Sequence, residues 1–140
     1  MSRFSGQRKV FADAGFLIAL FSRNDALHET AKSLFRDAIQ EKVEIHSSWP
    51  VVSEAVTLLR YHFGYGEAAA LLKALDGFHI HLPTGAECSA AAELFLKFSA
   101  NRKISFTDVL SLAMIKGRLR AMTALSFDKD FPALGLTVIR

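Results

Sequence analysis

Short apolar runs of strand-like composition alternate along the chain with segments whose apolar residues recur at helical spacing. The strand candidates are residues 9–13, 43–47, 78–82, 121–125 and 136–139. Strands separated by helices favour a parallel sheet, because each helix crosses back over a face of the sheet. A length of 140 residues suits one domain. We therefore expect an α/β fold in a single domain over residues 1–140, with a central, mostly parallel five-stranded sheet flanked by helices on both faces.

The helical segments differ in how much of their surface is apolar. Apolar residues follow one face between residues 27 and 38 and again between residues 91 and 98, which predicts two amphipathic helices. Between residues 49 and 63 they surround most of the helix, which predicts a buried helix. A further helix is expected over residues 67–75, because glycines stand on both sides of this segment.

Residues with capping preferences mark the expected ends of two helices. Ser47 or Ser48 suits the start of the buried helix, whose first turn contains a proline. Thr107 suits the start of another helix near Asp108, and Gly117 suits its end. These signals place Asp108 in a first helical turn, where the helix dipole favours a negative charge.

Four acidic residues interrupt or end apolar runs: Asp13, Glu54, Asp108 and Asp128. Asp13 and Asp128 follow predicted strands, and the carboxyl ends of parallel strands share the edge at which such sheets bind ligands. Glu54 would reach that edge from the buried helix. Four clustered carboxylates would repel one another unless a cation neutralised them. Oxygen ligands without a thiolate cluster favour Mg²⁺ or Mn²⁺.

The composition limits the classes of protein that remain. No apolar run approaches the roughly 20 residues needed to span a membrane. The single cysteine, Cys88, cannot form an internal disulfide, which is compatible with the cytoplasm. A net charge of +3 and a pI near 9.2 favour a polyanionic partner. Basic residues at 102–103 and 116–120 flank the Asp108 segment, although such charge runs are ordinarily solvated helix surfaces.

The segments that carry the four acids resemble PIN-domain ribonucleases, and within them the VapC-type toxins of bacterial and archaeal toxin–antitoxin pairs. The resemblance covers nearly the whole chain. Its segments are VFADAGFLIAL (residues 10–20), SWPVVSEA (48–55), SFTD (105–108) and ALSFDKDF (124–131). Each segment alone is weakly specific, whereas their order and spacing together are specific.

This resemblance implies a metal-dependent endoribonuclease that hydrolyses RNA phosphodiester bonds with Mg²⁺ or Mn²⁺. It implies that Asp13 and Asp108 are the principal metal ligands and that Glu54 and Asp128 complete the site directly or through water. Thr107 corresponds to the hydroxyl residue that commonly precedes the third acid. The family's pattern fits Asp128 better than the nearby Asp130.

The chain departs from the family's pattern at one position. Ala14 follows Asp13, where the family often has Thr or Ser, so a hydrogen bond that supports the first acid is expected to be missing. The resemblance also implies a protein antitoxin that covers the acidic site, and a homodimer formed by apolar helix faces. It does not identify the RNA target or the antitoxin.

Two other classes of protein were weighed against the ribonuclease. A phosphatase of the haloacid dehalogenase type would need Asp-x-Asp after the first strand, but Gly15 occupies the second acidic position. A PIN-like module that binds RNA or protein without cleaving remains the alternative, and the presence of all four acids argues against it. A phosphate-binding loop of the Gly-Lys-Ser/Thr type is absent from the sequence.

His79 and His81 alternate within residues 78–82, so both are expected on one face of that strand. Such a pair suggests a metal site, but a third ligand at a zinc-like spacing is absent. We interpret both histidines as positions of a half-exposed strand and assign neither to a site. No role is assigned to the other histidines, which are His28, His46 and His62.

Overall fold

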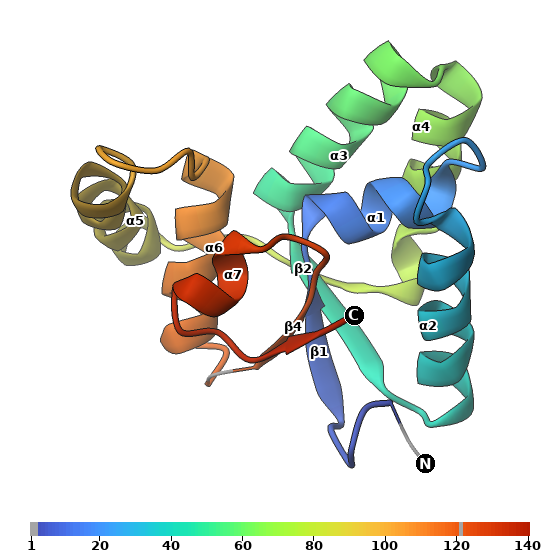
Figure 1. Cartoon of the computed structure of the whole chain (residues 1–140), viewed down its shortest axis with the longest axis horizontal. Coiled ribbons are helices and arrows are strands. Elements are labelled where there is room, and N and C mark those ends of the chain that lie inside the picture. Colours follow the sequence, from blue (N-terminus) through green and yellow to red (C-terminus); the bar gives the residue numbers. More distant parts are fainter. Residues whose placement is uncertain (1–2, 121) are drawn as a thin grey trace.

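The computed structural model describes residues 3–120 and 122–140, and it contains a sheet of five parallel strands between groups of helices (Figure 1). The strand order is β3-β2-β1-β4-β5. The strands are β1 (Lys9–Ala12), β2 (Glu44–Ser48), β3 (His79–His81), β4 (Thr123–Leu125) and β5 (Val138–Ile139). The predicted fold class is therefore confirmed.

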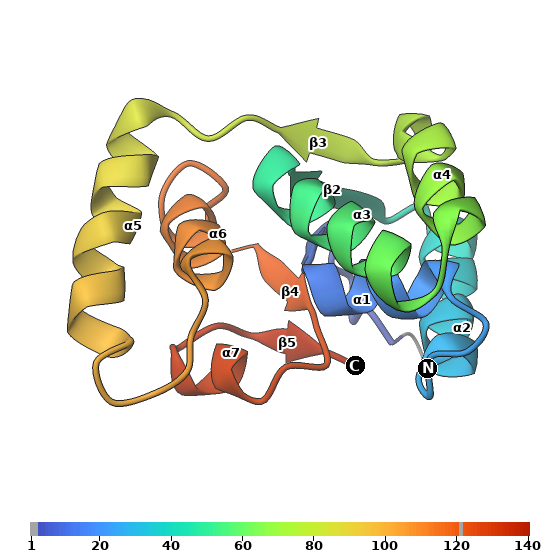
Figure 2. The ribbon, with the colours of Figure 1, turned by 90° about the horizontal axis from the view of Figure 1, so that it is seen from above.

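Seven α-helices and one 3₁₀ helix are found in the described residues. They are α1 (Ala14–Phe21), α2 (His28–Gln40), α3 (Trp49–His62), α4 (Tyr65–Lys73), η1 (Leu75–Gly77), α5 (Gly85–Phe98), α6 (Phe106–Lys116) and α7 (Asp130–Ala133). Helices α1 and α2 lie on one side of the strands, whereas α6 and α7 lie on the other, with α5 outside α6 (Figures 1 and 2). None of the described helices is long and apolar enough to cross a membrane.

The central strand explains why apolar runs predicted this sheet. Val10, Phe11 and Ala12 of β1 are all fully buried, because helices cover both faces of the sheet. A strand buried on both faces has a continuous apolar run instead of an alternating one. Every predicted strand overlaps an observed one, and no predicted end differs from the observed one by more than two residues. Ala121, the first residue of the fourth predicted strand, lies outside the described residues.

Helix α1 was not predicted from the sequence. Its residues, AGFLIALF, continue the apolar run of β1, so the boundary between strand and helix leaves little trace in the apolar pattern. The boundary is set by Asp13, whose carboxylate accepts a hydrogen bond of 2.8 Å from the Phe16 amide and caps the helix. This cap holds the Asp13 side chain at the carboxyl end of β1.

Helix α3 corrects the prediction of a buried helix. Its buried residues are Val51, Val52, Ala55 and Leu59. Trp49 is 46% exposed and Tyr61 is 80% exposed, so the helix is covered on one side only. The error arises because apolar residues around a helix do not show which of them another element covers. The predicted cap is confirmed, since the Ser48 hydroxyl accepts a hydrogen bond from the Val51 amide at 3.3 Å.

Helix α6 begins before the predicted position. Ser105 is its capping residue and accepts a hydrogen bond of 3.1 Å from the Asp108 amide. Thr107 therefore lies inside the first turn and is not the cap. Gly117 follows the last helical residue, as predicted. Asp108 remains in the first turn, where the positive end of the helix dipole favours its carboxylate.

Candidate active site

The four predicted acids border one cavity of about 290 Å³ at the carboxyl edge of the sheet. Asp13 directly follows β1, and Asp128 lies three residues beyond the end of β4. Asp108 comes from the first turn of α6 and Glu54 from α3. The structure thus brings together side chains from four separate segments, and their chemical role stays a prediction.

Asp13 is almost completely buried, with 5% of its surface exposed. Its Oδ1 accepts the hydrogen bond from the Phe16 amide, and its Oδ2 accepts one from the Ser126 hydroxyl. The Asp13 amide itself donates to the Leu125 carbonyl oxygen at 3.3 Å. Both carboxylate oxygens are therefore held in place without a hydroxyl at position 14. Ala14 cannot donate the expected hydrogen bond to Asp13, but the Ser126 hydroxyl donates one to the same carboxylate.

Ser126 also connects Asp13 with Asp128. Its hydroxyl oxygen accepts a hydrogen bond of 3.0 Å from the Asp128 amide, and the side chain is fully buried. The Asp128 carboxylate in turn accepts a hydrogen bond of 2.8 Å from the Asp130 amide. Asp128 lines the acidic cavity, whereas the described lining does not include Asp130. This placement favours Asp128 over Asp130 as the fourth acid.

Glu54, which lines the acidic cavity, has a buried carboxylate oxygen without a hydrogen-bond donor in the described residues. Within the part of the chain that the structure describes, its Oε2 has no hydrogen-bond partner. A buried carboxylate oxygen without a partner is costly, and a bound cation would remove that cost. Thr107 lies beside Glu54 in a neighbouring depression and does not line the acidic cavity.

Burial and mutual repulsion raise the pKa of two of the acids. The pKa of Asp13 rises to about 6, chiefly because of burial, with smaller contributions from the charges of Asp128 and Glu54. The pKa of Asp108 rises to about 7, again chiefly because of burial and then because of the charges of Asp128, Asp13 and Glu54. Strongly raised pKa values of grouped acids are typical of functional sites.

The sequence did not indicate two further residues of this site. Asp25 lines the same cavity and accepts a hydrogen bond of 2.9 Å from the Leu27 amide. It lies in a polar turn between α1 and α2, where aspartate is common for conformational reasons alone. Ser126 lies within a segment that was singled out for Asp128, yet its bond to Asp13 spans 113 residues. The sequence near Asp25 or Ser126 therefore does not show that either residue belongs to this site.

The donor set of the cavity suits a hard divalent cation. Its acids are Asp13, Asp25, Glu54, Asp108 and Asp128. Carboxylate oxygens are the ligands that Mg²⁺ and Mn²⁺ prefer. The partnerless oxygen of Glu54 and the raised pKa values of Asp13 and Asp108 both indicate negative charge that a cation would stabilise.

We predict that Asp108→Asn stabilises the protein at pH 8 in the presence of a chelator. The folded-state pKa of Asp108, about 7, lies above its ordinary value of 3.8. The stability contributed by protonated Asp108 is complete below about pH 4 and is lost as the pH rises through about 7. The variant escapes this loss, and because Asp108 is partly exposed we expect a gain of about 1–2 kcal/mol. Urea unfolding at pH 4 and pH 8 measures it.

The control for this experiment is Asp76→Asn, which changes an exposed acid in η1. It should leave the difference in unfolding free energy between pH 4 and pH 8 unchanged. Equal pH dependence of Asp108→Asn and the parent protein would contradict the raised pKa.

The sequence comparisons agree on one family. The PIN domain model matches residues 10–135. The chain is 30% identical over 133 residues to the 23S rRNA-specific endonuclease VapC20 of Mycobacterium tuberculosis, in strains CDC 1551 / Oshkosh and ATCC 25618 / H37Rv. This alignment covers 94% of the chain and 98% of the relative.

The comparison with solved structures adds agreement in three dimensions. The crystal structure of M. tuberculosis VapC20, described as a sarcin–ricin loop cleaving toxin, matches with a TM-score of 0.81, at 30% identity over 94% of this chain and 98% of that one. FitAcB from Neisseria gonorrhoeae matches with a TM-score of 0.66 at 16% identity, over 94% of this chain and 96% of that one, which supports the fold alone. The predicted likeness to VapC-type toxins is confirmed, and the chain belongs to the PIN-domain family.

Proposed function

We propose that this chain is a VapC-type endoribonuclease that hydrolyses RNA phosphodiester bonds with the help of Mg²⁺ or Mn²⁺. The observation that carries the proposal is the convergence of Asp13, Glu54, Asp108 and Asp128 on one cavity at the carboxyl edge of the sheet. The likeness to the endonuclease VapC20 over 94% of the chain supports the reaction class. The specific ion is part of the proposal.

Asp13 and Asp108 are the proposed principal ligands of the cation. Glu54 and Asp128 complete the site directly or through water, and Asp25 lies close enough to contribute because it borders the same cavity. In this site a divalent cation would lower the pKa of a water molecule, align the scissile phosphate and stabilise the charge that develops on its oxygens.

The chain itself supplies a preorganised set of carboxylates. Ser126 and the Phe16 amide fix both oxygens of Asp13, so this ligand loses little side-chain freedom when a cation binds. Asp13 and Asp108 would give up any proton that they retain near neutral pH when they hold the cation. A general base is not assigned, because metal-activated water needs none.

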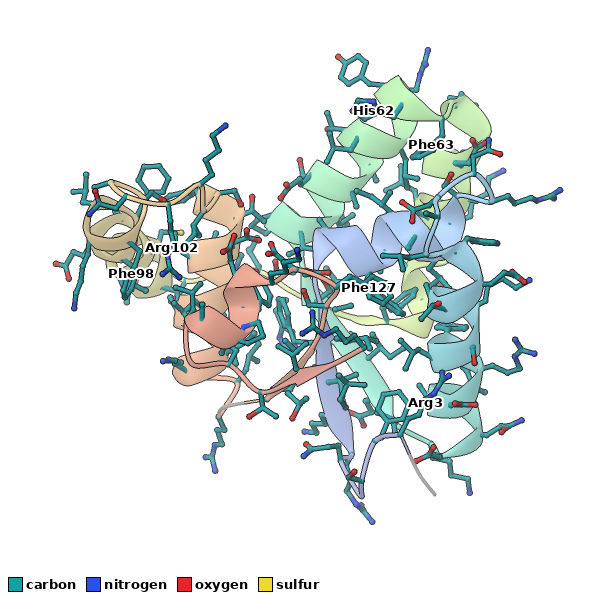
Figure 3. The ribbon with its side chains drawn as sticks, viewed as in Figure 1. Arg3, His62, Phe63, Phe98, Arg102 and Phe127 are labelled. Carbon is teal, nitrogen blue, oxygen red and sulfur yellow. The ribbon has the colours of Figure 1, made fainter. Side chains whose placement is uncertain are left out.

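One of the two basic clusters is well placed for the RNA backbone. Arg102 (Figure 3) and Lys103 are exposed in the loop that precedes α6, at the N-terminal end of this helix, whose first turn carries Asp108. Lys116 lies at the opposite end of α6, about 16 Å away along an 11-residue helix. We therefore propose Arg102 and Lys103 as phosphate contacts near the cavity.

We predict that Asp13→Asn and Asp128→Asn each lower metal-dependent RNA cleavage about a hundredfold or more, because each removes a charged ligand of the cation. Asp130→Asn is the matched control, since it changes an acid in the same turn that does not line the cavity. Cleavage of total cellular RNA is measured with Mn²⁺, with Mg²⁺ and with chelator, after circular dichroism has shown that each variant is folded.

Equal cleavage by the parent and Asp13→Asn would show that the assigned site is wrong. If folded parent protein bound RNA in a salt-dependent manner but cleaved none of it, the chain would be a PIN-like binding module instead.

We propose 23S rRNA as the substrate class, on the strength of the likeness to VapC20, which is described as 23S rRNA-specific and as cleaving the sarcin–ricin loop. The expected result with purified ribosomes is a cut in that loop that requires metal and disappears with Asp13→Asn. Mapping of RNA 5′ ends across ribosomal, transfer and messenger RNA locates the cut. Selective cleavage of transfer RNA with intact 23S rRNA would refute this choice of substrate.

We further propose that the chain acts in the cytoplasm as a homodimer and that a protein antitoxin covers the acidic cavity. The toxins that the chain resembles imply such partners, and exposed apolar side chains are available for them. Leu96 of α5 is 78% exposed, and Phe106 of α6 is 45% exposed beside Phe95, with 6.1 Å between the ring centroids. Apolar surface of this kind is typical of interfaces.

If the chain is a homodimer, sedimentation at micromolar protein concentration should give the mass of two chains. Leu96→Asp should shift the equilibrium toward the monomer if α5 forms the interface, whereas an exposed polar change, Ser89→Asp on the same helix, is the control. A monomer at every concentration of the parent protein would rule out the homodimer.

A further inference from the structure

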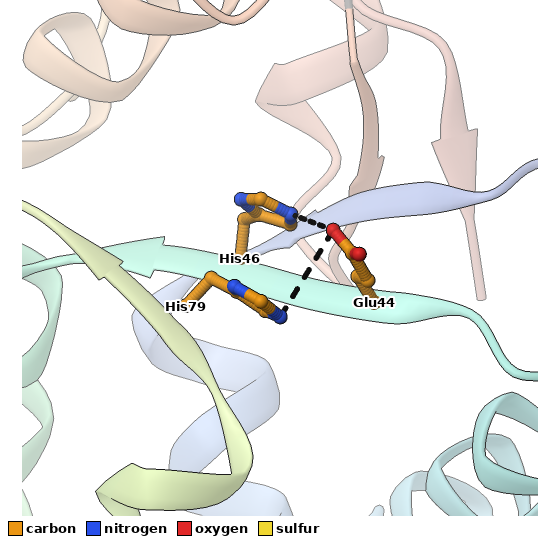
Figure 4. A group of neighbouring side chains, drawn as sticks. All are labelled: Glu44, His46 and His79. Atoms are coloured by element: carbon orange, nitrogen blue, oxygen red, sulfur yellow. Dashed lines mark hydrogen bonds and ion pairs between the residues drawn. The ribbon is translucent and has the colours of Figure 1, made fainter.

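Three side chains that can bind metal gather on one face of the sheet, outside the acidic cavity. Glu44 and His46 are two residues apart on β2, so both point to the same face. His79 is the register partner of His46 on the adjacent strand β3 and shares that face. Figure 4 shows both imidazole rings with a nitrogen directed toward the Glu44 carboxylate. Strand pairing therefore assembles the cluster from two distant segments.

The spacing of the ligand atoms fits a small tetrahedral ion. Glu44 Oε1 lies 2.9 Å from His46 Nε2 and 3.9 Å from His79 Nε2, and the three side chains each offer one ligand atom within 4.8 Å of those of the other two. Bonds of about 2.0–2.1 Å in tetrahedral geometry place ligand atoms about 3.3 Å apart. The observed separations lie on both sides of this value, so small side-chain rotations are enough to form the site.

The three side chains differ in how freely they can rotate. The side chain of His46 is 8% exposed, whereas those of Glu44 and His79 are 45% and 54% exposed. The His46 and His79 rings are stacked, with centroids 4.6 Å apart and planes 14° from parallel. His46 is therefore the fixed ligand, and His79 must turn its ring for both nitrogens to face one point.

His81 supports the buried ligand from the other side. Its Nε2 lies 2.7 Å from His46 Nδ1, a hydrogen bond that fixes the orientation of the His46 ring. Histidines that bind metal usually hydrogen-bond through their second nitrogen, and such partners strengthen metal binding. His81 is thus a positioning residue in this cluster and does not bind the ion.

We propose that Glu44, His46 and His79 form a second cation site, specific for Zn²⁺ or a similar imidazole-binding transition-metal ion. Two imidazoles and one carboxylate suit Zn²⁺ better than Mg²⁺, which prefers oxygen ligands alone. The same donor set occurs in zinc sites that leave a fourth position to water. Arg8 and Lys9 line the neighbouring cavity, and their positive charges oppose cation binding. The negative charge of Glu44 offsets this repulsion.

An ion at this position would join β3 to β2. Strand β3 has three residues and lies at the edge of the sheet, where β2 is its single neighbouring strand in the sheet order. A ligand that binds the folded chain and not the unfolded chain stabilises the fold by mass action. Zn²⁺ should therefore raise the melting temperature, an effect that does not depend on RNA cleavage.

The test is a calorimetric titration of the purified parent chain with Zn²⁺ in millimolar Mg²⁺, which is added to fill the cation site proposed in the acidic cavity. We expect one equivalent to bind and the melting temperature to rise. His79→Ala and Glu44→Gln each remove one exposed ligand and should weaken Zn²⁺ binding about tenfold or more. His62→Ala changes an exposed histidine of α3 and is the matched control, with affinity like that of the parent.

Co²⁺ provides a second readout that reports the geometry of the site. The parent protein should show visible absorption bands of the intensity typical of four-coordinate Co²⁺, and His79→Ala should lose them. Asp13→Asn should keep both the bands and the Zn²⁺ affinity, which separates this site from the acidic cavity. The proposal is overturned if His79→Ala binds Zn²⁺ as tightly as the parent, or if the folded parent binds none at millimolar Zn²⁺.

Discussion

Burial of the Asp13 carboxylate is the constraint on which the acidic cavity depends. Asp13 ends β1, caps α1 through the Phe16 amide and accepts a hydrogen bond from Ser126 beyond β4. Three elements therefore meet at a group whose charged form is disfavoured by burial. The fold keeps this unfavourable charge at the edge where four other acids converge, as expected where a cation binds in the functional state.

The sheet was predictable because parallel strands covered on both faces are short, continuous apolar runs. The same property concealed α1, whose apolar residues directly follow those of β1. Periodicity also overstated the burial of α3, since it records which residues are apolar and not which of them another element covers. The cap of α6 is Ser105 and not the predicted Thr107. Both are hydroxyl residues with the same capping preference, two positions apart, so the sequence does not show which of them begins the helix.

The acidic residues could be predicted because each stands at a break in an apolar run, where an unpaired charge is energetically costly. Asp25 could not, because a polar turn gives an aspartate an ordinary explanation. The cluster of Glu44, His46 and His79 was hidden for a different reason. Its ligands come from two strands, and the register that pairs His46 with His79 is a property of the folded sheet.

The long separation between Asp13 and its partner Ser126 affects the chain during its synthesis. Asp13, Glu54 and Asp108 are all made before Ser126 and Asp128. A nascent chain that lacks β4 and the residues after it therefore holds three of the four predicted carboxylates, but not the Ser126 hydroxyl that orients the first. The acidic cavity therefore cannot be complete before residues 126–128 have been made, because any shorter nascent chain lacks both Asp128 and the contact that orients Asp13.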